Sequence, residues 1–401
     1  MRLGIYGGSY NPPHLGHLHA AVAAAQYLHL DRLLFIPAGL PPHKMLAEGS
    51  PLPEQRAEMT EFLAQEAALA TGIPAEISRV ELERTGKSYT ADTLRELREI
   101  YPDAELWLLM GTDMFLTFQD WYKPEEILAC TGLCAFGRSE KDTEELFDVQ
   151  RTYLSQRFPN ARIATMVLPN LVEISSTELR AALPKGDGNK FLSPQVYGYI
   201  LREHLYGTAL DLKRLKTDEL RPIALSYLKA KRVRHVLGVE QEALRLADRY
   251  GADREKARVA ALLHDCTKKL DLEQQLSLCG SYGIELDELE RRALKLLHAK
   301  TGAAIARSVF GADEDICSAI LWHTTGRANM TLLEKVIYLA DYIEPSRDFE
   351  GVEPLRAAVY ESLDKGLELG LRMSIEELEA NGNPVHHNTQ EAYDYIRSHR
   401  L

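Results

Sequence analysis

The first part of the chain alternates short apolar runs with amphipathic segments. Five runs have the length and content of buried strands, at residues 2–6, 32–36, 105–109, 132–136 and 164–168. The segments between them repeat apolar residues at helical spacing, for example at residues 16–28, 54–69 and 90–100. Repeated strand–helix–strand order implies a parallel sheet with helices on both faces. We therefore predict an α/β doubly wound, Rossmann-like nucleotide-binding domain.

Beyond residue 206 the strand pattern ends. Apolar residues then recur at three- and four-residue spacing, in residues 240–250, 255–263, 289–298 and 332–343. This pattern predicts an all-α second half. A short stretch of mixed charge that contains Gly207 separates the two patterns. We place a first domain at residues 1–207, a linker at 208–217 and a second domain at 218–401.

Composition and charge exclude several classes of protein. The chain has 47 basic and 59 acidic residues, for a formal net charge of -12, which argues against a nucleic acid partner. The longest uncharged stretch, residues 11–30, holds prolines and histidines, so we expect no membrane span. The five cysteines lack metal-binding or disulfide spacing, and we find no signal peptide. A cytoplasmic protein is expected.

A glycine turn follows the first predicted strand and leads into a helix. Its residues are Gly7, Gly8, Ser9, Tyr10, Asn11, Pro12, Pro13, His14, Leu15, Gly16 and His17. Backbone N–H groups of such a turn can face a phosphate without an intervening Cβ. His14 and His17 flank Gly16, and both imidazoles can donate to phosphate oxygens. Fixed donors at the α-phosphate lower the barrier to adenylyl transfer, so we expect both histidines to be catalytic.

A second helix start lies in the sequence ISSTELR, at residues 174–180. Ser175 and Glu178 fit a capping box, which leaves Ser176 and Thr177 at a positive helix end, and Arg180 lies one turn beyond Ser176. This arrangement suits the β- and γ-phosphates of ATP.

The sequences GGSYNPPHLGH and ISSTELR, in this order, resemble the paired signatures of the HxGH nucleotidyltransferase superfamily. Further segments are similar to the nicotinate-mononucleotide adenylyltransferases: PPHK, SYTADTL, GTD and FQDWY, which begin at residues 41, 88, 111 and 118. The resemblance covers roughly residues 1–206.

This resemblance implies that ATP, with magnesium, and nicotinate mononucleotide give nicotinate adenine dinucleotide and pyrophosphate, a step of NAD biosynthesis. It also implies Thr90 and Trp121 at the nicotinate ring, Asp113 at the adenosine side and Lys44 near the phosphates. An enzyme of the superfamily that uses pantetheine phosphate or an alcohol phosphate remains the alternative for this half.

Four histidines and two aspartates lie on or beside apolar helices of the second half: His235, His264, Asp265, His298, His323 and Asp341. Imidazole and carboxylate groups suit iron, manganese or similar divalent metals. Because facing helices can bring distant residues to one centre, we predict a metal site.

The order H…HD…H…H…D resembles the HD superfamily, and Lys268 fits its HDxxK form. Five segments are similar to its YqeK-like branch over about residues 220–395: RHVLGV, HDCTKK, HTTGR, YLADYIEP and HNT. That branch hydrolyses diadenosine tetraphosphate symmetrically to two ADP, so the resemblance implies dinucleoside polyphosphate substrates.

The same resemblance implies how the second site works. His235, His264, Asp265 and Asp341 would hold one metal, and His298 with His323 a second ion bridged through Asp265. Lys268 and Arg327 are expected at the substrate phosphates. A non-catalytic nucleotide sensor is the alternative for this half. Both families often dimerise, so a homo-oligomer stays open.

Overall fold

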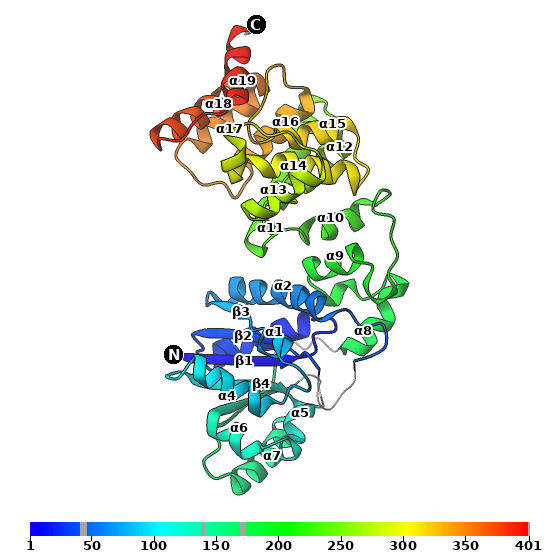
Figure 1. Ribbon diagram of the computed structural model, residues 1–401, viewed down its shortest axis with the longest axis vertical. Helices are drawn as coiled ribbons and strands as arrows, with labels where there is room; N and C mark the ends of the chain where they lie inside the picture. Colours follow the sequence, from blue (N-terminus) through cyan, green and yellow to red (C-terminus); the bar gives the residue numbers. More distant parts are fainter. Residues whose placement is uncertain (41–45, 138–140, 169–173, 400–401) are drawn as a thin grey trace. The chain divides into compact units, whose positions relative to one another are not determined.

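A computed structural model of the protein describes residues 1–40, 46–137, 141–168 and 174–399. The chain divides into two compact units, Met1–Ala209 and Leu210–Leu401. The first is an α/β unit and the second is helical (Figure 1), so both predicted fold classes are confirmed. The division falls inside the segment predicted as a linker, whose own limits stay a prediction.

The first unit is built on a six-stranded parallel sheet in the order β3-β2-β1-β4-β5-β6. The strands are β1 (Arg2–Gly8), β2 (Arg32–Pro37), β3 (Ala75–Ile77), β4 (Glu105–Gly111), β5 (Thr131–Phe136) and β6 (Ile163–Met166). The strand β3 was not predicted, because its three partly exposed residues carry no apolar run. The order reverses between β1 and β4, and ligands of such sheets bind beyond the carboxyl ends of the strands at this point.

Helices cover both faces of the sheet (Figure 1) because the β1 side chains alternate between two cores. Leu3 and Ile5 join one core, and Tyr6 joins the other. The helices on the Tyr6 side are α1 (Leu15–Tyr27) and α2 (Pro53–Thr71). Those on the other side are α4 (Thr90–Ile100), α5 (Thr112–Leu116), α6 (Pro124–Cys130) and α7 (Glu144–Arg157). The unit also contains α3 (Val80–Glu83), α8 (Ser176–Ala182) and α9 (Pro194–Arg202).

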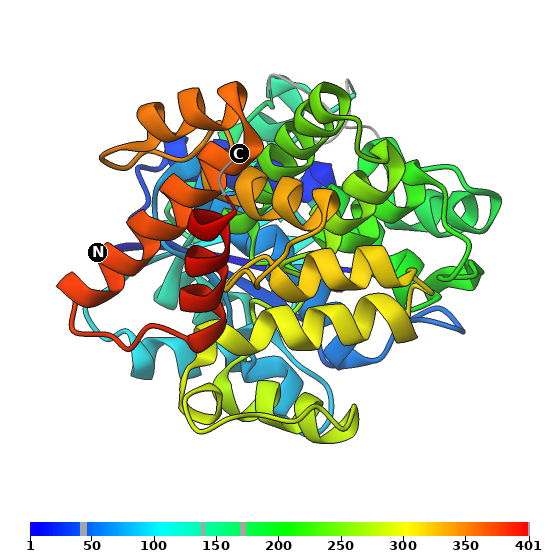
Figure 2. The ribbon, with the colours of Figure 1, turned by 90° about the horizontal axis from the view of Figure 1, so that it is seen from above.

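The second unit is a helical bundle around α11, α12, α15 and α16, and Figure 2 shows α14 and α15 side by side. Its helices are α10 (Thr217–Leu225), α11 (Ala230–Tyr250), α12 (Arg254–Leu263), α13 (Leu272–Ser281), α14 (Leu294–Ser308), α15 (Glu314–Trp322), α16 (Leu332–Ile343), α17 (Val352–Glu361), α18 (Leu363–Ala380) and α19 (His387–Ser398). The helix predicted at residues 289–298 begins only at Leu294, because Ala293 has a non-helical backbone with φ -107° and ψ 82°.

Within the described residues, none of the helices has both the length and the apolar content that crossing a bilayer requires.

Candidate active sites

A cavity of about 470 Å³ lies where β1 and β4 end. Every predicted site residue of the first unit that the structure describes lines it: Gly7, Gly8, Ser9, His14, His17, Thr90, Asp113, Trp121, Ser175, Ser176, Thr177 and Arg180. The predicted phosphate ligand Lys44 lies outside the described residues. The sheet therefore brings segments from four separate parts of the sequence to one cavity, as its strand order requires.

His14 and His17 face each other at the start of α1. His14 is the N-cap residue, and its N–H donates to Nδ1 of His17 over 3.2 Å. The two ring centroids are 3.9 Å apart. Because Nδ1 of neutral His17 accepts this bond, its proton sits on Nε2, which makes Nε2 a hydrogen-bond donor.

The start of α8 is bonded to the glycine turn. Ser175 caps α8 through the predicted capping box with Glu178, in which Ser175 Oγ accepts from Glu178 N–H at 3.1 Å. Ser176 Oγ donates to the Pro12 carbonyl at 3.2 Å, and Arg180 donates to the Asn11 carbonyl at 2.6 Å. The two motifs, far apart in sequence, thus form one wall of the cavity.

Aromatic side chains and a helix start form the opposite part of the cavity. Trp121 is half-buried, and the rings of Tyr89 and Tyr122 lie 4.6 Å apart. Helix α4 starts here at Thr90, and no side chain caps it. An uncapped helix N-terminus favours an anion.

Two residues at this cavity were missed by the sequence analysis. Glu81 lines the cavity, and burial raises its pKa to about 7 although Thr93 donates to it at 2.9 Å. Arg56 is fully buried and donates to the Ser9 carbonyl at 2.8 Å, which fixes the glycine turn from behind. Neither lies in a motif, so the sequence carried no signal for them.

The six predicted metal ligands converge inside the second unit. His235 Nε2 lies 2.9 Å from Asp341 Oδ1, and His298 Nε2 lies 3.2 Å from Asp265 Oδ1. Their ligand atoms form two groups that share one histidine: His235, His264 and Asp341, and His264, Asp265 and His323. Distances of this size between ligand atoms suit a common ion about 2 Å from each of them.

Helix ends orient two of these histidines. His264 and His323 are the C-cap residues of α12 and α15, where helix carbonyls lack intrahelical partners. Their Nδ1–H groups donate to the carbonyls of Ala261 and Ile320, each over 2.6 Å. The Nε2 atoms therefore carry the lone pairs that could bind a cation, as in established metal sites. Nε2 of His264 makes no hydrogen bond to a described residue, and Nε2 of His323 lies 3.0 Å from Nε2 of His298.

Buried polar atoms at the centre of this cluster fit a divalent cation. In the described part of the chain, His235 Nε2, His264 Nε2 and Asp265 Oδ1 are buried, and their close polar neighbours are other ligand atoms of the cluster rather than groups outside it. Burial lowers the pKa of His264 to about 3 and that of His298 to about 4, so both imidazoles are neutral ligands at pH 7. Such groups are costly to bury unless a cation binds them.

The two cations predicted at the substrate have different surroundings. Lys268 Nζ lies 3.0 Å from His298 Nε2, and burial lowers the pKa of this lysine. Arg327 instead pairs with the fully buried Glu334, at 3.0 Å. Among the predicted site residues of this unit, Arg327 is the one whose contacts with described residues lie away from the cluster, which favours a structural role.

Three residues that were not predicted as site residues contact the cluster. Arg232 and Arg347 pair with Asp265 and Asp341, at 2.5 and 2.7 Å. Glu344 Oε1 lies 3.0 Å from His235 Nδ1. In sequence, Arg232 and Glu344 stand three residues from a ligand and Arg347 stands six residues from one; this spacing, and for Glu344 the YLADYIEP segment, were the available signals.

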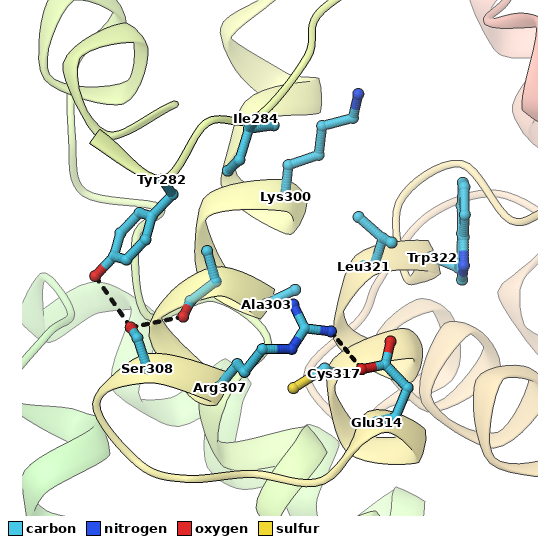
Figure 3. Close-up of a pocket in the computed structure, with 11 residues that line it drawn as sticks. Tyr282, Ile284, Lys300, Ala303, Arg307, Ser308, Glu314, Cys317, Leu321 and Trp322 are labelled. Atoms are coloured by element: carbon cyan, nitrogen blue, oxygen red, sulfur yellow. Dashed lines mark hydrogen bonds and ion pairs between the residues drawn. The ribbon is translucent and has the colours of Figure 1, made fainter. Parts of the chain in front are cut away.

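A further histidine group and a second cavity lie elsewhere in this unit. His386 Nε2 lies 3.2 Å from Asp287, but its Nδ1 accepts from Asn388 N–H, so Nε2 of the neutral ring carries the proton and anchors α19. The second cavity, of about 450 Å³, lies between α13, α14 and α15 (Figure 3), where Arg307 pairs with Glu314 and Tyr282 with Ser308. Both polar pairs join exposed side chains of this unit to one another.

Comparison with known proteins matches each half separately. A cytidylyltransferase-like family model matches residues 5–182, and an HD domain model matches residues 232–346. A probable nicotinate-nucleotide adenylyltransferase of Thermus thermophilus is 35% identical over 204 residues, which cover 51% of this chain and 98% of the relative. A symmetrical bis(5'-nucleosyl)-tetraphosphatase of Halalkalibacterium halodurans is 40% identical over 171 residues, 42% of this chain and 91% of the relative.

Among solved structures, a predicted HD superfamily hydrolase involved in NAD metabolism, from Clostridium acetobutylicum, is 45% identical. It covers 46% of this chain and 99% of its own, with a TM-score of 0.45.

Proposed function

The chain belongs to the nicotinate-nucleotide adenylyltransferase family in its first half and to the HD-domain symmetrical bis(5'-nucleosyl)-tetraphosphatase family in its second, and we propose on this basis a bifunctional enzyme. The first half transfers AMP from ATP to nicotinate mononucleotide, in NAD biosynthesis. The second half hydrolyses diadenosine tetraphosphate to two ADP. The observation that carries the proposal is the convergence of each family's motif residues on a site of its own.

For the adenylyl transfer, the mononucleotide's phosphate oxygen attacks the α-phosphorus of magnesium-bound ATP, and pyrophosphate leaves. His14 and His17 donate hydrogen bonds to the charge that develops on the α-phosphate. Ser175 to Thr177, with Arg180, bind the β- and γ-phosphates at the start of α8. The phosphate of the mononucleotide attacks directly, without a covalent enzyme intermediate. Positioning of the substrates therefore supplies most of the rate enhancement.

The acceptor side of the cavity supports the acid form of the mononucleotide. The uncapped start of α4, at Thr90, suits the nicotinate carboxylate, while Trp121 stacks on the ring. Asp113 binds on the adenosine side, and Lys44 acts near the phosphates.

For the hydrolase, the residues present would hold iron or manganese, with two ions bridged by Asp265. Its Oδ1 faces His298 and its Oδ2 faces His264, which supports the bridging role. A divalent cation there supplies Lewis acidity toward phosphate oxygens and acidifies water. The side chains of this chain orient the substrate: Lys268 brings positive charge to the phosphates, and the buried histidines keep their Nε2 atoms facing inward.

Free thiols support a cytoplasmic location, since all five cysteines are unpaired in the structure.

The first activity is tested by measuring pyrophosphate release with nicotinate mononucleotide, the amide mononucleotide and phosphopantetheine. We expect nicotinate mononucleotide to be preferred and His17→Ala to lower kcat by about 100-fold or more, because one transition-state donor is lost. His29→Asn is the matched control, as His29 is exposed with a φ of 50°, which asparagine tolerates. Preference for phosphopantetheine would replace the assignment.

The second activity is tested with diadenosine tetraphosphate, comparing the wild type with Asp265→Ala. ADP formation should require Asp265 and return with iron or manganese after chelation. Asp248→Asn, an exposed carboxylate on α11, is the control and should keep full activity. A metal-loaded protein that cleaves no dinucleoside polyphosphate would make this half a nucleotide sensor.

A further inference from the structure

Two arginines lie directly on the carboxylates of the hydrolase site. Arg232 donates from Nε to Asp265 Oδ2 at 2.6 Å, and its second nitrogen lies 2.5 Å from the same oxygen. Arg347 donates to Asp341 Oδ1 at 2.7 Å and to the Asp341 carbonyl at 2.8 Å. Each of the two ligand groups therefore has its own arginine, since Asp341 belongs to one group and Asp265 to the other.

The two arginines are more exposed than the carboxylates they contact. The side chain of Asp265 is 0% exposed and that of Asp341 is 20% exposed, whereas those of Arg232 and Arg347 are 28% and 32% exposed. Lys268, on the same cluster, is 36% exposed. Three basic side chains of the site thus reach solvent.

A divalent cation changes what these arginines can bind. A buried carboxylate needs a positive partner, and an ion among the ligands supplies it. The guanidinium groups then have N–H donors that are no longer needed by the carboxylates. Two N–H donors of one planar guanidinium group can bind two oxygens of a phosphate. Arg327 is placed differently, because its guanidinium group bonds both oxygens of the buried Glu334 rather than a predicted metal ligand.

We propose that Arg232 and Arg347, together with Lys268, form the polyphosphate-binding surface of this site. The two arginines grip phosphates on either side of the bond that is cut, so that each holds one nucleoside diphosphate half of the substrate. This inference rests on the proposed hydrolase function, and it replaces Arg327 with Arg232 and Arg347 as the phosphate ligands.

The test measures ADP binding by calorimetry to the full-length, metal-loaded protein. Nicotinate adenine dinucleotide is present throughout, to fill the N-terminal site. We expect Arg232→Gln and Arg347→Gln each to raise the Kd of ADP about tenfold or more, which is the loss expected for one charge-assisted phosphate contact. Metal content, measured on the same samples, should not fall, because neither arginine is a metal ligand.

A matched variant controls for general effects of losing an arginine. Arg234→Gln removes an exposed arginine two positions along α11. It should leave the Kd of ADP within twofold of the wild type. Arg232→Lys and Arg347→Lys keep the positive charge but lose the planar guanidinium group. Their Kd values for ADP should fall between those of the wild type and the glutamine variants.

The outcomes separate this inference from the proposed function. An unchanged Kd of ADP in both glutamine variants, at full metal content, overturns the inference even if the wild type hydrolyses diadenosine tetraphosphate. Loss of metal without loss of affinity in the metal-loaded fraction also overturns it, because the arginines would then only support the ligands. Arginine-dependent ADP binding by a wild type that hydrolyses nothing keeps the inference and rejects the hydrolase.

Discussion

Glu344 lies buried beside His235, and its carboxylate accepts from the Nδ1–H of that histidine. Ser346 N–H donates to the other carboxylate oxygen at 2.6 Å, which keeps the group charged and in place. Its pKa is held below the usual range although burial opposes ionisation, because Ser346 and His235 favour the carboxylate. Glu344 thus fixes the tautomer of His235 from outside the ligand set.

Replacing Glu344 should weaken metal binding without removing a ligand. We expect Glu344→Ala to lower metal affinity about 10- to 100-fold, as loss of an outer partner of a ligating histidine does elsewhere. Titration of the metal against a competing chelator measures this. Glu353→Ala, on exposed α17, should bind the metal like the wild type. Unaltered affinity in Glu344→Ala would mean that His235 needs no partner.

Gly238 makes room for this carboxylate. A Cβ there would lie 2.3 Å from Glu344 Oε2, so Gly238→Ala should destabilise the helical unit by about 1–3 kcal/mol and weaken metal binding. Gly280→Ala is the matched control in α13, where a Cβ meets nothing within 4 Å, and it should be neutral or slightly stabilising. Thermal melts of the two variants decide whether the contact matters.

How far the sequence predicted these sites depended on residue type. The histidines and aspartates of the metal cluster were predictable, because their order is rare and suits one chemistry. Arg232, Arg347 and Glu344 were not predicted, although Glu344 lies in the YLADYIEP segment, because arginine and glutamate are common on solvated surfaces and only packing brings these three to the ligands.

At the scale of helices and strands, α2 and α9 bury a carboxylic acid between them. Burial raises the pKa of Glu66 to about 7, although Ser193, the N-cap of α9, bonds to it. A pKa above the unfolded value means that the folded state binds the proton more tightly. The stability this contributes is full below about pH 4.5 and is lost as pH rises through 7.

The α/β unit should therefore become less stable between pH 5 and 8, and Glu66→Gln should remove the part of that dependence that comes from Glu66, leaving the part from Glu81, whose pKa is also raised to about 7. We expect the variant to exceed the wild type by about 2–3 kcal/mol at pH 8 and to match it near pH 5. Calorimetric melts of the full chain across this range measure the difference. Glu58→Gln, also on α2, serves as the comparison. Parallel curves for Glu66→Gln and wild type would show that the group titrates normally.

Element boundaries were less predictable than element types. Strand β3 pairs with β2 through only three residues, so backbone hydrogen bonds rather than an apolar pattern define it. The helix α14 starts late because the segment before it folds as a short 3-10 turn at Glu290–Arg292. In both places tertiary contacts decide the structure.

At the scale of the whole chain, we expect the two units to respond separately to loss of metal, because they are separate compact units. Chelation should abolish diadenosine tetraphosphate hydrolysis and lower the Tm of the helical unit, because a metal at 100 times its Kd contributes about 2.7 kcal/mol to folding. Adenylyl transfer, assayed with magnesium restored, should be unchanged. If chelation instead lowers the Tm of both calorimetric transitions, the two units unfold together.

One consequence follows from His264 and His323 lying at the ends of α12 and α15. Each imidazole satisfies a terminal carbonyl of its own helix through Nδ1, so the cation side of the ring and the last helical turn are mechanically joined. Metal binding should therefore slow amide hydrogen exchange in the final turns of these two helices. Fraying of those turns would in turn provide the route by which the ion is released.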